Sequence, residues 1–263
     1  MVHEVARIFG MDFIYLDILF CVIWMIVLIR KKYHLQFLFG LFGACVVFFT
    51  DYVIWYTIKG TRIINEVPFN EVLFLVYFSF TYGMIEFSYV AVLFSVKNWK
   101  KIAFWSSFLL GGWFLIGFLS QWIHLDDRTI DIVRLMSNAR WGQVGMAVGG
   151  YLVLVILKYT WEPFKHLTWT RLGFLFLIGF FVHFSMETTL LAAGIRPLEG
   201  AFTVLLFNSF IEFNTGVPIL YFAWVLLKDR GISTGKKLDS YPALQETESF
   251  IEESEITTTV EEK

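Results

Sequence analysis

Residues 12–32, DFIYLDILFCVIWMIVLIRKK, form an apolar stretch that ends in a basic cluster. A helix needs about 20 apolar residues to cross a hydrocarbon core of roughly 30 Å, and residues 12–30 reach that length. Because Arg30, Lys31 and Lys32 follow the apolar stretch and do not precede it, the pattern differs from a cleaved signal peptide. It predicts a membrane-spanning helix near the N-terminus.

Six further stretches share this length and character. The predicted spans are 12–30, 35–58, 70–96, 101–124, 137–158, 171–194 and 201–227. We therefore predict an all-α polytopic membrane protein with seven transmembrane helices. Residues 1–11 would be a short extracytoplasmic N-terminus, 12–230 the seven-helix bundle and 231–263 a tail.

The composition of the 263-residue chain agrees with a membrane protein. Hydrophobic residues make up 57%, aromatic residues 19% and charged residues 17%, against roughly 45–50% apolar and about 25% charged in soluble domains. A soluble enzyme, a disordered chain and a disulfide-stapled secreted domain are excluded. Cys21 and Cys45, each in an apolar stretch, form no metal motif. We expect no cofactor, no bound metal and no nucleic-acid partner.

The basic residues of the connections predict the orientation. They accumulate after spans one, three, five and seven, in RKKYH (30–34), KNWKK (97–101), KYTWEPFKHLTWTR (158–171) and KDRGISTGKK (228–237). Lys and Arg are enriched on the cytoplasmic side of membrane proteins. The pattern predicts a multi-pass protein of the cell membrane, with its N-terminus outside and its C-terminus in the cytoplasm.

The C-terminal segment differs in composition from the rest of the chain. Residues 238–263 hold eight acidic residues and one Lys, with no apolar periodicity. Such a composition is typical of a disordered, solvated segment. The alternative interpretation is a regulatory tail that binds a cytoplasmic partner.

Ionisable and amide side chains inside the spans are the strongest indication of a site, because they are costly in a bilayer. They are Asp17, Asp51, Glu86, Arg140, Gln143, His183, Glu187, Asn208 and Glu212. The last six form three pairs: Arg140 with Gln143, His183 with Glu187, and Asn208 with Glu212. The members of each pair are three or four residues apart, and residues at this spacing share a helix face. Lipid offers these faces no partner, so they should turn inward.

At about 1.5 Å of rise per residue, most of these side chains fall in the outer half of their spans. They predict an outer-half cavity with Asp17, Asp51, Arg140, His183 and Glu187 in its wall and Asn208 and Glu212 as its floor. Structural interpretations remain open. Asp17 and Asp51 could be interfacial residues, Arg140 a counter-ion, and His183 a hydrogen-bonding group between helices.

The sequence lacks the residues that several known functions of seven-helix proteins require. A retinal protein needs a Schiff-base Lys in its last span, and span seven has none before Lys228. A zinc hydrolase would need several His ligands, whereas His183 is the single embedded His. The sequence signatures of G-protein-coupled receptors are also missing.

Two acids lie in aromatic-rich surroundings that suit acid catalysis. Asp51 and Glu212 are flanked in sequence by Phe48, Phe49, Tyr52, Trp55, Phe207, Phe210 and Phe213. A carboxyl group buried among apolar side chains tends to stay protonated, as a general acid must. Aromatic faces stabilise a developing cation.

Three stretches resemble a known family. They are WMIVLIRKKYHLQFLFGLFGACVVFFTDYVIWYT (24–57), LFSVKNWKK (93–101) and FNSFIEFNTGVPILYFAW (207–224), together 61 of the 263 residues. The arrangement resembles the small seven-helix integral-membrane terpene cyclases of fungal meroterpenoid and indole-diterpene pathways and their bacterial relatives. That resemblance implies one essential acid late in the second helix, at Asp51, and another in the last helix, at Glu212. Asp51 follows Phe-Phe-Thr, where the family has a Trp-containing context.

These observations predict an integral-membrane enzyme that acts by acid/base chemistry on an isoprenoid or other lipid-like substrate. The predicted catalytic residues are Asp51, His183, Glu187 and Glu212. The predicted substrate-binding residues are Asp17, Trp55, Arg140, Gln143 and Asn208. The expected partners are that lipid or isoprenoid molecule and membrane lipids. The alternatives are a binding protein or transporter for a small lipophilic or cationic ligand, and a sensory or scaffold protein that signals through its acidic tail.

Overall fold

The computed structural model describes residues 3–136, 140–197 and 201–229, so the predicted tail at 231–263 lies outside the described part. The described chain is mostly helical, and it contains seven helices long and apolar enough to cross a membrane. The seven predicted spans are therefore confirmed as apolar helices. Their observed ends differ from the predicted ones by a few residues.

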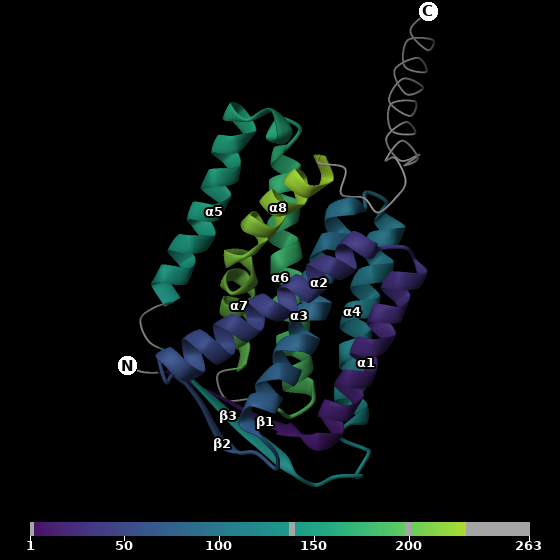
Figure 1. Cartoon of the computed structure of the whole chain (residues 1–263), viewed down its shortest axis with the longest axis vertical. Coiled ribbons are helices and arrows are strands. Elements are labelled where there is room, and N and C mark those ends of the chain that lie inside the picture. Colours follow the sequence, from purple (N-terminus) through teal and green to yellow (C-terminus); the bar gives the residue numbers. More distant parts are fainter. Residues whose placement is uncertain (1–2, 137–139, 198–200, 230–263) are drawn as a thin grey trace, which may run out of the picture.

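The helices form a bundle (Figure 1). They are α1 (Met11–Arg30), α2 (His34–Phe48), the π-helix η1 (Phe49–Ile58), α3 (Glu71–Ser95), α4 (Trp99–Leu119), α5 (Arg140–Thr160), the 3-10 helix η2 (Glu162–Phe164), α6 (Trp169–Ala192), α7 (Ala201–Ile211), the 3-10 helix η3 (Phe213–Thr215) and α8 (Val217–Asp229). Helix α2 and η1 together make the second span. The seventh span is divided into α7, η3 and α8.

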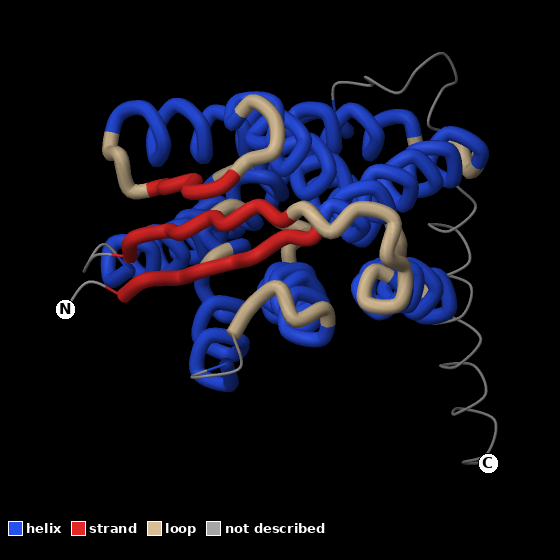
Figure 2. Tube along the Cα trace, turned by 90° about the horizontal axis from the view of Figure 1, so that it is seen from below, coloured by secondary structure: helices blue, strands red, loops and turns tan. Residues whose placement is uncertain are grey.

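The expectation of an all-α fold is wrong. Three antiparallel strands, β1 (His3–Gly10), β2 (Arg62–Glu66) and β3 (Thr129–Met136), form a sheet in the order β1-β3-β2. Figure 2 shows the sheet lying across one end of the bundle. Its strands come from the N-terminal segment and from two connections between helices. We call this end of the molecule the sheet end.

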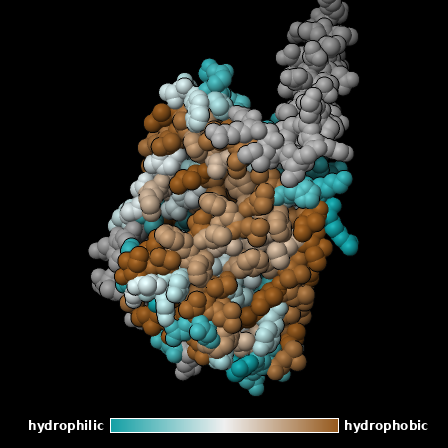
Figure 3. Space-filling view, in the orientation of Figure 1, coloured by the Kyte–Doolittle hydropathy of each residue, from teal (hydrophilic) through white to brown (hydrophobic). Residues whose placement is uncertain are grey.

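The two ends of the bundle differ in chemistry. The basic connections after α1, α3 and α5 lie at the end opposite the sheet (Figure 1). Between the ends, apolar side chains cover much of the visible surface (Figure 3). Helix α1 alone exposes Tyr15, Ile18, Leu19, Val22, Ile23, Ile26 and Ile29. An exposed apolar band between polar ends is typical of a helical bundle in a bilayer.

Close packing of α2 on α3 fixes the position of η1. A Cβ atom added at Gly43 would lie 2.3 Å from Phe87, and one added at Gly83 would lie 2.5 Å from the Ala44 backbone. Small residues at such a crossing let two helix backbones approach each other. Because η1 continues α2, this crossing also fixes the place of Asp51 on η1.

The second and seventh spans are irregular near the sheet end. In η1 the Lys59 amide donates to the Ile54 carbonyl five residues earlier. This is the π-helical pattern, which frequently occurs at functional sites. The seventh span breaks after Ile211, and Pro218, which has no N–H group, lies in the first turn of α8. Thr215 Oγ1 satisfies the freed Glu212 carbonyl at 2.7 Å. Asp51 and Glu212 thus lie in the irregular segments of their spans.

Candidate functional site

The sheet presents three arginines on one face. Arg62 of β2 pairs directly with Arg134 of β3, and Arg7 of β1 pairs with Ile132. Because Ile132 and Arg134 are two residues apart on one strand, all three guanidinium groups lie on the same side of the sheet. This side faces the helices, as the burial of Arg7 and Arg62 and the contacts of Arg134 show.

Carboxylates from the helices meet these arginines. Arg62 Nη2 lies 2.5 Å from Asp51 Oδ1 of η1, and Arg134 Nη2 lies 2.8 Å from Glu212 Oε1 at the end of α7. Like charges on directly opposed strand positions repel each other, so the helices supply the compensating charge that the sheet lacks. The sheet and the helices therefore form one electrostatic unit.

Glu187 of α6 binds two arginines. Its Oε1 atom lies 3.3 Å from Arg7 Nη2 and 2.6 Å from Arg196 Nη2, and its side chain is fully buried. Arg196 lies just beyond the C-terminal end of α6, where its backbone amide donates to the Leu190 carbonyl. The arginine thus returns toward the acid of its own helix.

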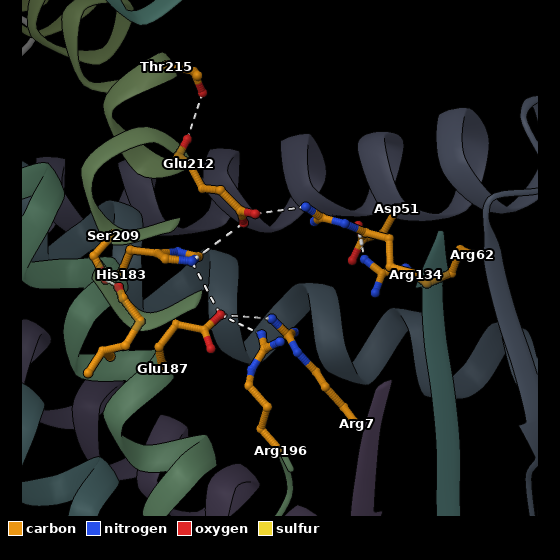
Figure 4. A network of polar contacts seen from close by, with 11 residues as sticks. Arg7, Asp51, Arg62, Arg134, His183, Glu187, Arg196, Ser209, Glu212 and Thr215 are labelled. Atoms are coloured by element: carbon orange, nitrogen blue, oxygen red, sulfur yellow. Dashed lines mark hydrogen bonds and ion pairs between the residues drawn. The ribbon is translucent and has the colours of Figure 1, made fainter. Parts of the chain in front are cut away.

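His183 lies between two of the carboxylates (Figure 4). Its Nε2 atom is 3.4 Å from Glu187 Oε1 and 3.5 Å from Glu212 Oε2. His183 and Glu187 are one helical turn apart on α6, so they share a face, whereas Glu212 comes from α7. Nε2 makes no hydrogen bond with a described residue at these separations, so the imidazole lies close to both carboxylates without being bonded to either.

We call this group the arginine–acid cluster, and it surrounds a small recess. The cluster consists of Arg7, Asp51, Arg62, Arg134, His183, Glu187, Arg196, Asn208 and Glu212. The recess is lined by Arg7, Arg62, Ile132, Arg134, Arg196, Asn208 and Glu212, and its volume is about 10 Å³. A cavity of this size holds about one water molecule.

The recess reaches the outside at one edge. The side chains of Arg134 and Glu212 are 14% and 15% exposed, more than those of the other ion-paired members of the cluster. The Arg134 guanidinium lies 4.5 Å from the centre of the Trp55 ring, a cation–π contact. Trp55 of η1 therefore flanks the mouth.

Burial and neighbouring charges change the pKa values of the arginines outside the spans. Burial opposes the charge on Arg7, but the combined attraction of Glu187, Tyr82, Glu212 and Asp51 outweighs the effect of burial, and the pKa of Arg7 is raised. Burial and the charge of Arg7 lower the pKa of Arg196 to about 10. Burial also lowers the pKa of Arg62, against the pull of Asp51. All three stay protonated at neutral pH.

The structure brings together most of the side chains predicted for the site. Four predicted catalytic residues, Asp51, His183, Glu187 and Glu212, belong to the cluster, and Asn208 lines the recess. Trp55, predicted to bind substrate, flanks the mouth. These positions agree with a shared cavity, while the roles of the residues remain predictions.

Three predicted binding residues are not placed in the cluster. Asp17 is buried between other helices and accepts a hydrogen bond from Tyr77 at 2.9 Å. Gln143 is half-buried on α5 and is not among the described residues that line the recess. Arg140 begins α5, and its side chain lies outside the described part of the structure.

Two further observations limit the chemistry of the site. Glu86 of α3 is buried, forms no ion pair with a described residue, and has one oxygen, Oε1, without a hydrogen-bond partner. Among the described residues, no group of three His, Cys, Asp or Glu side chains is arranged to hold a metal ion. The chemistry that the described side chains offer is proton transfer and charge stabilisation.

The sequence interpretation missed all four arginines of the cluster. They are Arg7, Arg62, Arg134 and Arg196, and each lies outside the predicted spans. The signal for the first three was weak, because the strand segments HEVARIFG, RIINE and TIDIVRLM alternate between apolar and polar residues only in part, as in residues 129–132. Within a strand, Arg134 shares a face with Ile132 two positions away.

Comparison of the chain with models of protein families, with curated proteins and with solved structures finds no match. The functional argument therefore depends on the geometry of the cluster.

Proposed function

We propose that this protein is an integral-membrane enzyme that acts by acid/base chemistry on an isoprenoid or other lipid-like substrate at the arginine–acid cluster. The observation that carries the proposal is the position of His183 between the carboxylates of Glu187 and Glu212. Imidazole is the side chain that both donates and accepts protons near neutral pH. An imidazole between two acids can pass a proton from a buried group to a group at the mouth.

Each member of this chain of groups has a defined part in the proposal. Glu212, at the mouth, would exchange a proton with the substrate. His183 would restore the protonation state of Glu212. Glu187, held by Arg7 and Arg196, would orient the imidazole and stabilise it when charged. Asp51 would fix Arg62 at the recess, and Trp55 would hold Arg134 at the mouth through their cation–π contact.

We also propose that the protein spans the cell membrane several times with the sheet outside. The basic connections at the opposite end support this orientation, because Lys and Arg are retained on the cytoplasmic side. The site would then lie in the outer half of the membrane. Both Trp55 and Glu212 belong to candidate membrane spans, so a lipid could approach the mouth from within the bilayer.

The second candidate function is a binding protein or transporter. The break between α7 and α8 favours it, because discontinuous membrane helices commonly form the binding sites of transporters. With four arginines in the recess, its ligand would be lipophilic and neutral or anionic, since a cation would meet like charge. In this case the acids would hold the arginines and would not perform chemistry.

Chromatography and mass spectrometry of lipid extracts would distinguish the two candidates. We would compare membranes with the native chain, His183→Gln, and the matched control His124→Gln, whose imidazole is exposed in the connection after α4. The enzyme proposal predicts a product peak that is lost in His183→Gln, with its precursor accumulating, and that is unchanged in the control. Identical extracts from a folded His183→Gln protein, in a host that contains isoprenoids, would contradict it.

A further inference from the structure

The arginines of the recess have more hydrogen-bonding capacity than their partners use. The Nε atoms of Arg7, Arg62 and Arg196 have no hydrogen-bond partner among the described residues, and all three residues are more than nine-tenths buried. A buried donor without an acceptor is destabilising. Three such donors around one recess indicate that an acceptor-rich group belongs there.

The balance of charge in the ion pairs points in the same direction. Four guanidinium groups line or face the recess, while the carboxylates that pair with them come from Asp51, Glu187 and Glu212. Glu187 serves two arginines through a single oxygen, Oε1. Among the described residues, these ion pairs thus join four guanidinium groups to three carboxylates, and an anion would balance the remaining positive charge.

We propose that the recess binds the phosphate group of an isoprenoid phosphate. A phosphate monoester offers several acceptor oxygens, and guanidinium groups match it with paired, charge-assisted hydrogen bonds. This proposal names a substrate class for the enzyme function proposed above. That the substrate is an isoprenoid rests on the proposed function, whereas that it carries a phosphate rests on the arginines alone.

The mouth of the recess shows how the phosphate would enter. The free volume of about 10 Å³ is too small for a phosphate beside the present ion pairs. Arg134 and Glu212 are the most exposed of the ion pairs in the cluster. The phosphate would therefore replace the Glu212 carboxylate on Arg134, and Glu212 would turn toward the substrate.

Binding to the purified full-length protein in a non-ionic detergent tests the proposal. The probes are farnesyl phosphate, farnesol and inorganic phosphate, measured by calorimetry. We expect farnesyl phosphate to bind at least tenfold more tightly than farnesol. If inorganic phosphate alone binds as well as farnesyl phosphate, the natural source is a free anion; if farnesyl phosphate is strongly preferred, it is a lipid headgroup. Equal affinity for farnesol and farnesyl phosphate, or no binding of either phosphate, would overturn the proposal.

Two variants show whether binding occurs at the recess. Arg134→Gln should weaken farnesyl phosphate binding tenfold or more, and Arg134→Lys, which keeps the charge but loses the paired donors, should have an intermediate effect. The matched control is Arg128→Gln, because Arg128 is an exposed arginine of the same end, 2.7 Å from Asp126. If Arg128→Gln and Arg134→Gln weaken binding equally, binding depends on surface charge, and the proposal that the recess binds the phosphate is overturned.

The lipid comparison separates this proposal from the enzyme function. If the product is lost in His183→Gln but neither phosphate binds, the enzyme proposal stands and only the phosphate proposal is rejected. If phosphate binds but no product depends on His183, the anion site stands and the enzyme proposal is rejected.

Discussion

Two buried acids, Glu187 and Asp17, lie in surroundings that differ in one respect. Both side chains are almost fully buried, at 0% and 1% exposure for the residues. Glu187 forms ion pairs with Arg7 and Arg196, whereas Asp17 forms no ion pair with a described residue and accepts a hydrogen bond from Tyr77. The two acids are thus equally buried, but only Glu187 has cationic side chains paired with it among the described residues.

The difference shows where this fold maintains charge in its interior. Arginines reach Glu187 because the sheet and the segment after α6 cover the sheet end of the bundle. Asp17 lies on α1 among neighbouring helices that bring no cation to it. An unpaired carboxyl group away from water is accommodated by hydrogen bonding and by holding a proton. A group of paired charges therefore forms at the sheet end, and Asp17 is not part of it.

The largest expected effect is that of Glu187→Gln. It would leave the guanidinium groups of Arg7 and Arg196 buried without their shared counter-ion, and breaking a buried ion pair costs about 3–5 kcal/mol. The midpoint of thermal unfolding in detergent should fall by roughly 10 °C. Glu162→Gln, which removes an exposed acid that pairs with Lys165, should leave the midpoint unchanged. Similar midpoints for the two variants would contradict the importance of the cluster for stability.

A smaller effect is expected for Asp17→Asn. The amide oxygen of Asn can accept the Tyr77 hydrogen bond as the carboxyl oxygen does, and no counter-ion among the described residues is lost. The free energy of unfolding should change by about 1 kcal/mol or less. This can be measured in the same detergent by thermal unfolding. A loss as large as that of Glu187→Gln would show that Asp17 is charged and paired, and the two regions would then be alike.

The smallest effect is expected at Arg128, whose side chain is 57% exposed and pairs with the partly buried Asp126. Hydrogen bonds from the Arg128 guanidinium hold the pKa of Asp126 well below its usual range. Because the pKa is lowered on folding, this pair stabilises the protein at neutral pH, and its contribution disappears as the pH falls through the lowered pKa. Arg128→Gln should leave the unfolding midpoint at pH 7 almost unchanged, since exposed pairs contribute little. A clear fall at pH 7 would show that this pair resembles the buried ones.

The helices were predictable because their signal is long. Each span is a stretch of about 20 mostly apolar residues. The mean hydropathy over a window of that length identifies a membrane helix without knowledge of tertiary contacts. The strands have five or eight residues each, and their pairing joins segments more than 50 residues apart, as in Arg62 with Arg134. Such short segments, with only partial alternation of apolar and polar residues, have the same composition as an ordinary connection, so the sheet was not predicted.

The acids of the site were predictable and their partners were not. Asp51, His183 and Glu212 are polar residues in apolar spans, where a polar side chain requires an explanation. The four arginines lie outside the spans, where arginine is common and needs none. The break of the seventh span had a local signal in Gly216 and Pro218. The π-helix at Asp51 had none, since its hydrogen bonds depend on how the chain turns into β2.

The most direct test compares the two regions in the lipid assay. Membranes with Glu212→Gln and with Asp17→Asn would be extracted and analysed by chromatography and mass spectrometry, after both proteins are shown to fold and to be present in equal amount. Our account predicts that the product is lost in Glu212→Gln, with its precursor accumulating, and is retained in Asp17→Asn. Retention of the product in Glu212→Gln, or equal loss in both variants, would contradict the assignment of the chemistry to the arginine–acid cluster.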